Sequence, residues 1–309
     1  MSELILHHYP MSPFAEKARL MLGFKGLAWR SVLIPPVMPK PDLTALTGGY
    51  RKTPVLQVGA DVYCDTALIA RLLEARQPAP TLFPASAPLA PALAQWADSH
   101  LFWCAVPWAM QPAGAAAIMA DQPPEILKVF AADRAAMAGA MRRQTLPDAS
   151  AQLQGHLAAI DAQLQRGGPW LLGEQASVAD FSVAHCLWFI RRAAPVAHIL
   201  APHAALTAWL DRVLAIGHAT PTPLASADAV QLAARAAGHA PCSVQPGLGF
   251  EAGQAVNVAA TDYGSDPVAG TLVGLDATEV VLRRHDERAG TVHVHFPRQG
   301  FQIRKETTA

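Results

Sequence analysis

The sequence predicts three parts in order: an α/β domain, an all-α domain and a small all-β domain. Strand and helix patterns alternate up to residue 76, helical periodicity dominates residues 92–237, and short strand-like runs fill residues 254–304. The length of 309 residues is about twice that of a usual single domain, which agrees with more than one unit.

The first part alternates short strands and helices. A helix is expected after Ser12, because serine is a good N-cap and Pro13 suits the first helical position. In chain order we expect a strand at residues 4–8, this helix, a strand at 29–34, a Pro-rich loop at 35–41, a hairpin of 54–58 with 62–64, and a helix at 66–76. This order predicts a small sheet covered by helices.

A Pro-rich linker and a helical part follow. Five prolines in residues 77–91 exclude a continuing helix there. The expected helices cover residues 92–119 with kinks, 124–143, 149–166, 177–192, 202–216 and 225–237. The uncharged stretch 99–120 is long enough to span a membrane, but its prolines and Gly114 predict a kinked, buried helix instead, and we expect no membrane partner.

The last part has the pattern of a small β domain. Strand-like runs at residues 255–260, 268–275, 279–283, 291–296 and 301–304 are separated by turn residues, which predicts an SH3-like barrel. Because residues 238–249 are typical of a connector, we expect residues 1–240 to fold without this part. His293 and His295 share one strand face, as metal ligands sometimes do, but no third ligand lies at a telling spacing, so we expect no metal.

Composition limits the class of protein and its partners. Apolar residues make up 51% and charged residues 16%, which excludes a disordered chain. The 24 basic residues equal the 24 acidic ones, so no overall charge favours nucleic acid, and we expect none as a partner. Four widely spaced cysteines and no signal-peptide pattern lead us to expect a cytoplasmic, reducing environment.

Four segments, in this order, resemble landmarks of the cytosolic glutathione S-transferases of the tau and omega types. They are residues 12–19 after the first strand, 52–56, 63–69, and 170–173 with 177–181. The resemblance covers about residues 1–235. It implies a thioredoxin-like N-terminal domain at 1–84 and an all-helical C-terminal domain at 85–240, which leaves 241–309 as a small β domain of unknown role. It also implies glutathione as co-substrate, an electrophilic, largely apolar small molecule as second substrate, and a homodimer.

Ser12 is the candidate catalytic residue. A hydroxyl at a helix N-terminus lies beside free backbone N–H groups and the positive end of the helix dipole, which favour an anion such as the glutathione thiolate. Ser12 could donate a hydrogen bond to that sulfur and so increase its ionised fraction. A helix cap without chemistry is the alternative, and Tyr9 is the rival hydroxyl.

The resemblance also assigns residues to the two substrates. Phe14, Thr53 and Pro54 would contact glutathione, and a cis bond before Pro54 is implied. Lys40 and Lys52 could each reach the glycyl carboxylate, although either could be a solvated lysine. Asp65 and Thr66 offer an acid, a hydroxyl and bare N–H groups to the γ-glutamyl end. The family usually has Glu-Ser at this position; Asp-Thr keeps both roles with a shorter acid.

Other residues have structural readings as well. The same resemblance implies that Trp103 and Trp108 line the electrophile pocket, with an aromatic core stripe as the alternative. Ser177 and Asp180 have the pattern of a capping box and receive no chemical role. Three alternatives for function stay open: a thiol transferase, a dehalogenase-like enzyme, and a non-catalytic glutathione-binding protein with a protein partner on residues 241–309. Omega-like relatives carry cysteine at the position of Ser12. Because this chain has serine there, mixed-disulfide chemistry is disfavoured.

Overall fold

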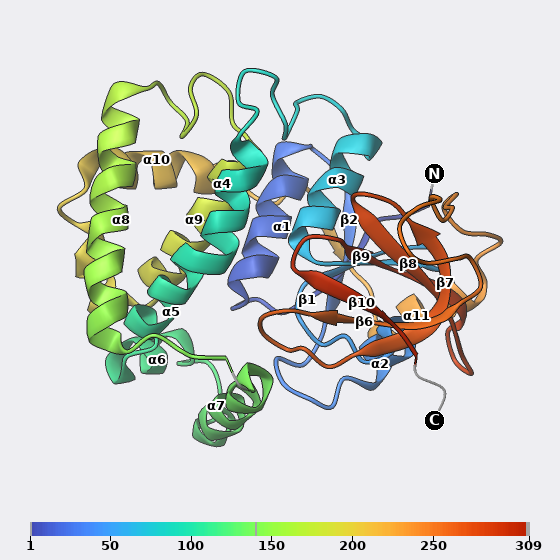
Figure 1. Cartoon of the computed structure of the whole chain (residues 1–309). Helices are drawn as coiled ribbons and strands as arrows, with labels where there is room; N and C mark the ends of the chain where they lie inside the picture. Colours follow the sequence, from blue (N-terminus) through green and yellow to red (C-terminus); the bar gives the residue numbers. More distant parts are fainter. Residues whose placement is uncertain (1, 140, 307–309) are drawn as a thin grey trace.

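The computed structural model describes residues 2–139 and 141–306 and joins the strands into one ten-stranded sheet, with a helical domain to one side (Figure 1). The N-terminal elements are β1 (Ile5–His8), α1 (Pro13–Phe24), β2 (Trp29–Leu33), α2 (Pro41–Thr47), β3 (Val55–Val58), β4 (Asp61–Cys64) and α3 (Thr66–Arg76). Their strand order is β4-β3-β1-β2, with β1 and β2 parallel and the other pairs antiparallel. This confirms the thioredoxin-like domain.

Helix α2 was not expected from the sequence. Pro41 occupies its first turn, where proline needs no N–H partner, and Gly48 ends it with a φ of 76°. The Pro-rich segment 35–41 is therefore a loop that ends where the short helix α2 begins.

The helical domain contains the predicted helices, but they begin and end at different residues than predicted. Its elements are α4 (Ala90–Trp96), the π-helix η1 (Ala97–Leu101), α5 (Phe102–Ala109), α6 (Pro112–Ile118), α7 (Pro124–Ala138), α8 (Leu146–Arg166), α9 (Val178–Arg192), the 3-10 helix η2 (Ala194–Leu200) and α10 (Ala204–Leu214). The capping box at the start of α9 is present as predicted: the Ser177 side chain accepts from the Asp180 backbone, and the Ser177 N–H donates to the Asp180 carboxylate at 2.8 Å.

The apolar stretch before residue 120 is bent. Among the described residues, no single helix is long and apolar enough to cross a membrane; Ala90–Ala109 and Pro112–Ile118 meet that test only as a pair, with a bend of 98° between them.

After α10 the chain returns to the N-terminal sheet. Strand β5 (Pro221–Pro223) pairs in parallel with β2, and helix α11 (Ser226–Ala234) packs against α2 and β9. Gln57 in β3 donates to the Ala229 carbonyl at 2.8 Å. The last helix that the sequence predicted thus lies with the sheet and not with the helical bundle.

The appended β region is present, and all five of its strands were predicted. They are β6 (Ala255–Ala260), β7 (Val268–Leu275), β8 (Glu279–Asp286), β9 (Gly290–Pro297) and β10 (Phe301–Lys305). Their order, β10-β6-β7-β8-β9, is that of an SH3-like barrel. In addition, β9 pairs in parallel with β4, with Val62 opposite Val294, so the appended strands continue the thioredoxin-like sheet.

The appended region and the N-terminal domain share one hydrophobic core. Buried side chains of the N-terminal domain, such as Tyr50 and Val62, belong to the same cluster as Val256, Val294 and Phe296. The expectation that residues 1–240 fold alone is therefore not supported, because removing the appended region would expose apolar surface of the N-terminal domain to water. The division into residues 1–84, 85–240 and 241–309 stays an interpretation of the sequence.

Candidate functional site

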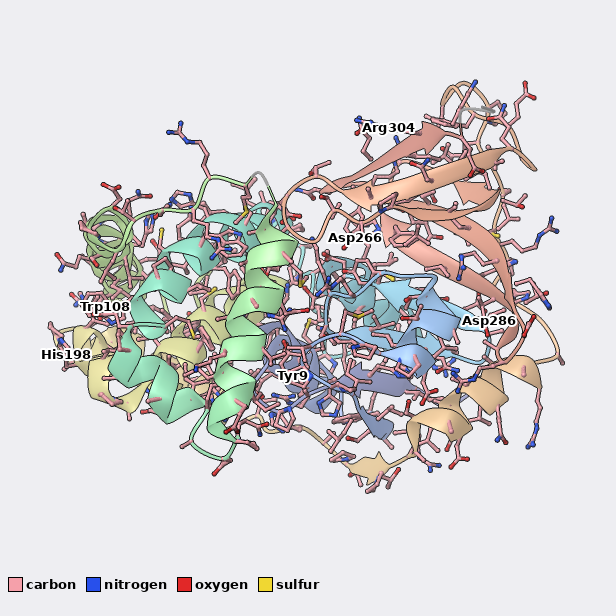
Figure 2. The ribbon with its side chains drawn as sticks, turned by 90° about the horizontal axis from the view of Figure 1, so that it is seen from below. Tyr9, Trp108, His198, Asp266, Asp286 and Arg304 are labelled. Carbon is pink, nitrogen blue, oxygen red and sulfur yellow. The ribbon has the colours of Figure 1, made fainter. Side chains whose placement is uncertain are left out.

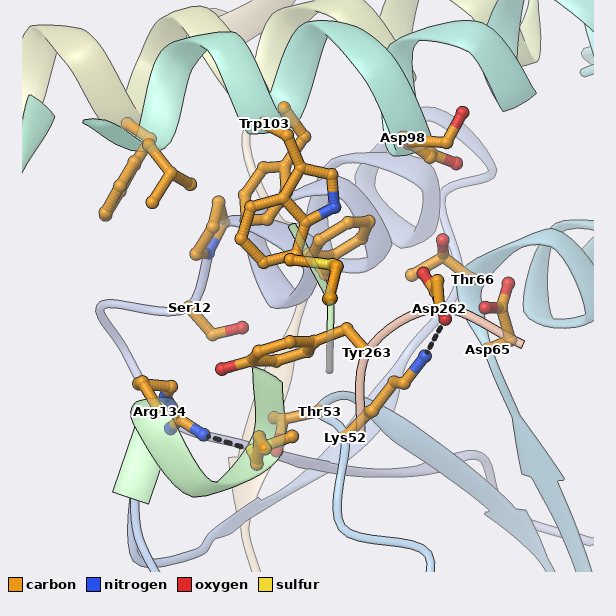
Figure 3. Close-up of a pocket in the computed structure, with 18 of the residues that line it drawn as sticks. Ser12, Lys52, Thr53, Asp65, Thr66, Asp98, Trp103, Arg134, Asp262 and Tyr263 are labelled. Atoms are coloured by element: carbon orange, nitrogen blue, oxygen red, sulfur yellow. Dashed lines mark hydrogen bonds and ion pairs between the residues drawn. The ribbon is translucent and has the colours of Figure 1, made fainter. Parts of the chain in front are cut away.

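A cavity of about 740 Å³ lies where the N-terminal domain, helices α5 and α7 and the appended β region meet (Figure 3). Nine of the eleven site residues predicted from the sequence line it. They are Tyr9, Ser12, Phe14, Lys52, Thr53, Pro54, Asp65, Thr66 and Trp103.

Ser12 lies in this cavity as the N-cap of α1. Its Oγ accepts a hydrogen bond from the Ala15 N–H at 3.2 Å, and the side chain is buried. Because the cap uses an oxygen lone pair, the O–H remains a separate donor. The residue thus combines a donor with the positive end of a twelve-residue helix.

Tyr9 lines the same cavity, but its hydroxyl has another neighbour. It accepts a hydrogen bond from Arg134 Nη2 of α7 at 3.5 Å, and the Lys40 ammonium lies 5.7 Å from the ring centroid. The hydroxyl therefore contacts a cation rather than the free N–H groups of α1.

An acid, a hydroxyl and a buried ion pair meet at the start of α3. Asp65 has a φ of 75°, a conformation that costs energy for a residue with a Cβ, and its Oδ1 accepts from the Ala67 N–H at 2.8 Å. Lys17 Nζ donates to Thr66 Oγ1 at 3.0 Å and to Asp98 at 2.5 Å.

The two carboxyls of this region have opposite pKa shifts. Burial raises the pKa of Asp65. Burial alone would also raise the pKa of Asp98, but the Lys17 ammonium and His185, whose Nε2 lies 2.9 Å from Asp98 Oδ1, hold it below its usual value. Asp98 comes from η1 and was not predicted, because nothing in the sequence places it beside Lys17.

The two predicted lysines have different surroundings. Lys52 Nζ lies 2.8 Å from Asp262 Oδ1 at the cavity wall. Lys40 is not among the residues that line the cavity: it is buried and donates to the Arg51 carbonyl at 3.2 Å and to Thr53 Oγ1 at 3.3 Å. Burial, together with the nearby Arg134 cation, lowers the pKa of Lys40 to about 8. The bond before Pro54 is cis, as the sequence comparison implied.

Trp108 does not line the cavity, which corrects the prediction. Its Nε1 donates to the Val196 carbonyl at 2.8 Å, and its ring lies 5.9 Å from that of His198. Figure 2 shows both residues at the outer side of the helical domain, away from Tyr9. Five residues rotate a helix by about 140°, so Trp103 and Trp108 cannot face the same side.

The appended region supplies cavity residues that sequence reasoning missed. Tyr263, in the loop between β6 and β7, packs its ring edge against Trp103 at 5.1 Å between centroids. Its hydroxyl is turned toward Ser12 and Arg134 (Figure 3). Burial raises the pKa of Tyr263, which keeps the phenol neutral and able to donate a hydrogen bond.

The loop that carries Tyr263 is fixed against helix α7. The Gly264 N–H donates to the Met137 carbonyl at 2.8 Å, and Gly264 has a φ of 60°. The positive φ favours glycine at this turn, and a Cβ here would first meet the flexible end of Met137, whose Cε would lie 2.8 Å away. Trp103 and Tyr263 are 160 positions apart, and no short-range signal in the sequence predicts a contact between them.

Comparisons with known proteins match both the N-terminal domain and the helical domain. Family models for the glutathione S-transferase N-terminal domain and C-terminal domain match residues 6–81 and 134–212. A solved GST-like protein from Pseudomonas syringae is 45% identical, with a TM-score of 0.82, over 99% of this chain and 100% of that chain. No curated protein matches.

Two further solved structures share the fold at low identity. Glutathione transferase GSTFuA3 from Phanerochaete chrysosporium is 22% identical, with a TM-score of 0.55, over 70% of this chain and 98% of that chain. The beta-etherase LigF from Sphingobium sp. strain SYK-6 is 18% identical, with a TM-score of 0.52, over 70% of this chain and 96% of that chain. The Pseudomonas match spans the appended β region as well, since it covers nearly the whole chain.

Proposed function

Because the chain belongs to the glutathione S-transferase family, we propose that it conjugates the glutathione thiolate to an electrophilic, largely apolar small molecule in the cytoplasm. The observation that carries this proposal is Ser12, a buried helix N-cap whose O–H can still donate a hydrogen bond inside a large cavity.

Ser12 lowers the pKa of the glutathione thiol by donating its O–H to the sulfur anion, while the α1 dipole adds a favourable field. A free cysteine thiol has a pKa near about 8.5, so a modest reduction makes the thiolate abundant at neutral pH. The sulfur then forms a bond to the electrophilic carbon as that carbon's leaving group departs, or as its π electrons shift to a neighbouring acceptor atom.

The cavity offers complementary groups along the length of glutathione. The γ-glutamyl carboxylate is bound by Thr66 and the N–H groups at the start of α3, and the ammonium by Asp65 and Asp98. The backbone of Thr53 pairs with the cysteinyl unit in the manner of an added strand. Lys52 binds the glycyl carboxylate as a point charge and is shared with Asp262.

The second substrate binds on the side of α5, α7 and the appended loop. The wall there is mainly apolar or aromatic, which selects for size and polarity rather than for one compound. Its members are Phe102, Trp103, Val106, Met110, Phe130 and Tyr263. We propose that Tyr263 donates a hydrogen bond to an acceptor atom of the electrophile and thereby orients it.

Calorimetric titration with glutathione, followed by conjugation assays on a panel of aromatic and unsaturated electrophiles, tests the proposal. We expect saturable binding together with turnover. Binding without turnover on any electrophile would favour the non-catalytic alternative, in which the appended region serves a partner. Reduction of mixed disulfides without conjugation would favour the thiol transferase.

A further inference from the structure

Three histidines and a carboxylate meet where the appended region joins the N-terminal sheet. Asp61 begins β4, His293 and His295 lie on β9, and His239 lies in the connector after α11. Asp61 and His293 are register partners in the β4–β9 pair. Residues that the sequence separates by more than 230 positions are thus brought to one place.

The polar atoms of this group surround one oxygen of Asp61. His295 Nε2 lies 2.9 Å from Asp61 Oδ1, while His239 Nδ1 and His293 Nδ1 lie 3.9 and 4.0 Å from the same atom. Asp61 Oδ2 accepts from the Ala240 N–H at 2.9 Å. One ligand atom each from Asp61, His239 and His293 lies within 4.8 Å of the other two.

Three imidazole nitrogens of this group are buried and lack a hydrogen-bond partner among the described residues: the Nδ1 atoms of His239, His293 and His295. His293 as a whole is only 9% exposed. Burying a polar atom without a hydrogen-bond partner destabilises a protein, so such atoms in a native structure call for a partner.

We propose that Asp61, His239 and His293 bind a divalent transition-metal ion such as zinc. One carboxylate oxygen and two imidazole nitrogens form a common zinc donor set, and water completes the tetrahedron. Zinc ligands lie about 2.0–2.2 Å from the ion, so the three side chains close in around it.

His239 supplies the movement that this closure needs. Its ring stacks on that of His293 at 3.7 Å between centroids and 12° between planes, and both nitrogens can point at one ion only if the rings tilt apart. The His239 side chain is 23% exposed and lies in the connector, so it can turn without disturbing a strand.

The surrounding groups orient and balance the ligands. His295 holds Asp61 in place, and Glu279 Oε2 lies 3.5 Å from His295 Nδ1. Carboxylate and histidine partners of this kind commonly fix the geometry of metal ligands. The two carboxylates also offset the charge of a divalent cation.

The ion has a structural role. Asp65, which lines the cavity, comes four residues after Asp61, or about 13 Å further along an extended strand. The metal therefore lies away from the reacting groups and ties together β4, β9 and the connector. This inference does not depend on the proposed transferase activity.

A second group, His100, Cys104 and His156, has similar spacing and serves as the internal comparison. It is the weaker candidate, because the Cys104 thiol already has the Gln144 and Gln152 side-chain oxygens at 3.6 and 3.8 Å. Nothing acidic belongs to this group.

Equilibrium dialysis of chelator-treated full-length protein against Zn²⁺, with thermal denaturation in parallel, tests the proposal. We expect one tightly bound ion per chain, which raises the melting temperature. His239→Gln should weaken binding by about tenfold or more and reduce the thermal shift at the same Zn²⁺ concentration. His239→Gln is the main variant because the His239 side chain is partly exposed, so this substitution is a smaller risk to folding than His293→Gln.

Two matched variants serve as controls. His285→Gln changes an exposed histidine on β8, and Cys104→Ser changes the comparison group; both should bind Zn²⁺ as the unmodified protein does. Failure to bind one ion per chain overturns the proposal. So does unchanged binding in His239→Gln, or loss of binding in Cys104→Ser.

Discussion

Ending the chain after Ala240 should prevent folding rather than release a smaller active protein. The appended region covers Tyr50, whose ring lies 5.8 Å from that of Phe296, and Tyr63, whose ring stacks on His295 at 4.3 Å. Val62 faces Val294 across the β4–β9 pair. All three N-terminal side chains are buried in the full chain.

The cost of exposing them is comparable to the stability of the whole protein. Burying one large apolar side chain contributes about 1.5–3 kcal/mol, so exposing three costs roughly 5–9 kcal/mol. A folded domain has about 5–15 kcal/mol in all. The backbone of β4 would also become an unpaired sheet edge, which promotes aggregation.

Circular dichroism, dye binding and a thermal melt of the 1–240 chain, beside the full chain, measure this effect. We expect low solubility, dye binding typical of exposed apolar surface and no cooperative transition. A soluble 1–240 chain that unfolds cooperatively and binds glutathione would refute the reasoning, because the shared core would then contribute little.

Three further expectations concern the site and the assembly. Tyr263→Phe should lower kcat/KM for the electrophile by about 2- to 13-fold, the value of one hydrogen bond at 0.5–1.5 kcal/mol, with little change in glutathione affinity; equal kinetics would remove Tyr263 from the mechanism. Asp98 has a lowered pKa, so its stabilising effect is complete above about pH 4 and is lost as the pH falls toward its folded value; acid melts of Asp98→Asn should show a weaker pH dependence, and identical slopes would contradict this. Light scattering should give the mass of a homodimer, about twice 32.8 kDa, and the mass of one chain would argue against the dimer.

Local signals in the sequence predicted most elements and the N-terminal half of the site. Ser12, Thr53, Asp65 and Thr66 lie at helix starts or next to prolines, and such positions are readable from a few neighbouring residues. The five appended strands were readable for the same reason, because turn residues separate them.

Long-range contacts were not predictable in this way. Asp98, Arg134 and Tyr263 come from three separate elements, and only the folded chain brings them to the cavity. The pairing of β9 with β4 likewise depends on a shared core, which no local pattern specifies. Trp108 was misplaced because the resemblance assigned a whole helix to the pocket, and membership of a helix does not give the direction of each side chain.

Ultraviolet difference spectroscopy of bound glutathione is the most direct test of the central claim that Ser12 stabilises the thiolate. Losing one charge-assisted hydrogen bond should cost about 1.5–3 kcal/mol, so Ser12→Ala should raise the thiol pKa by roughly 1–2 units and lower kcat/KM about ten- to a hundredfold. Tyr9→Phe is the matched control and should leave the thiolate absorbance intact. If Tyr9→Phe abolishes that absorbance while Ser12→Ala retains it, Ser12 is only a helix cap and the account is contradicted.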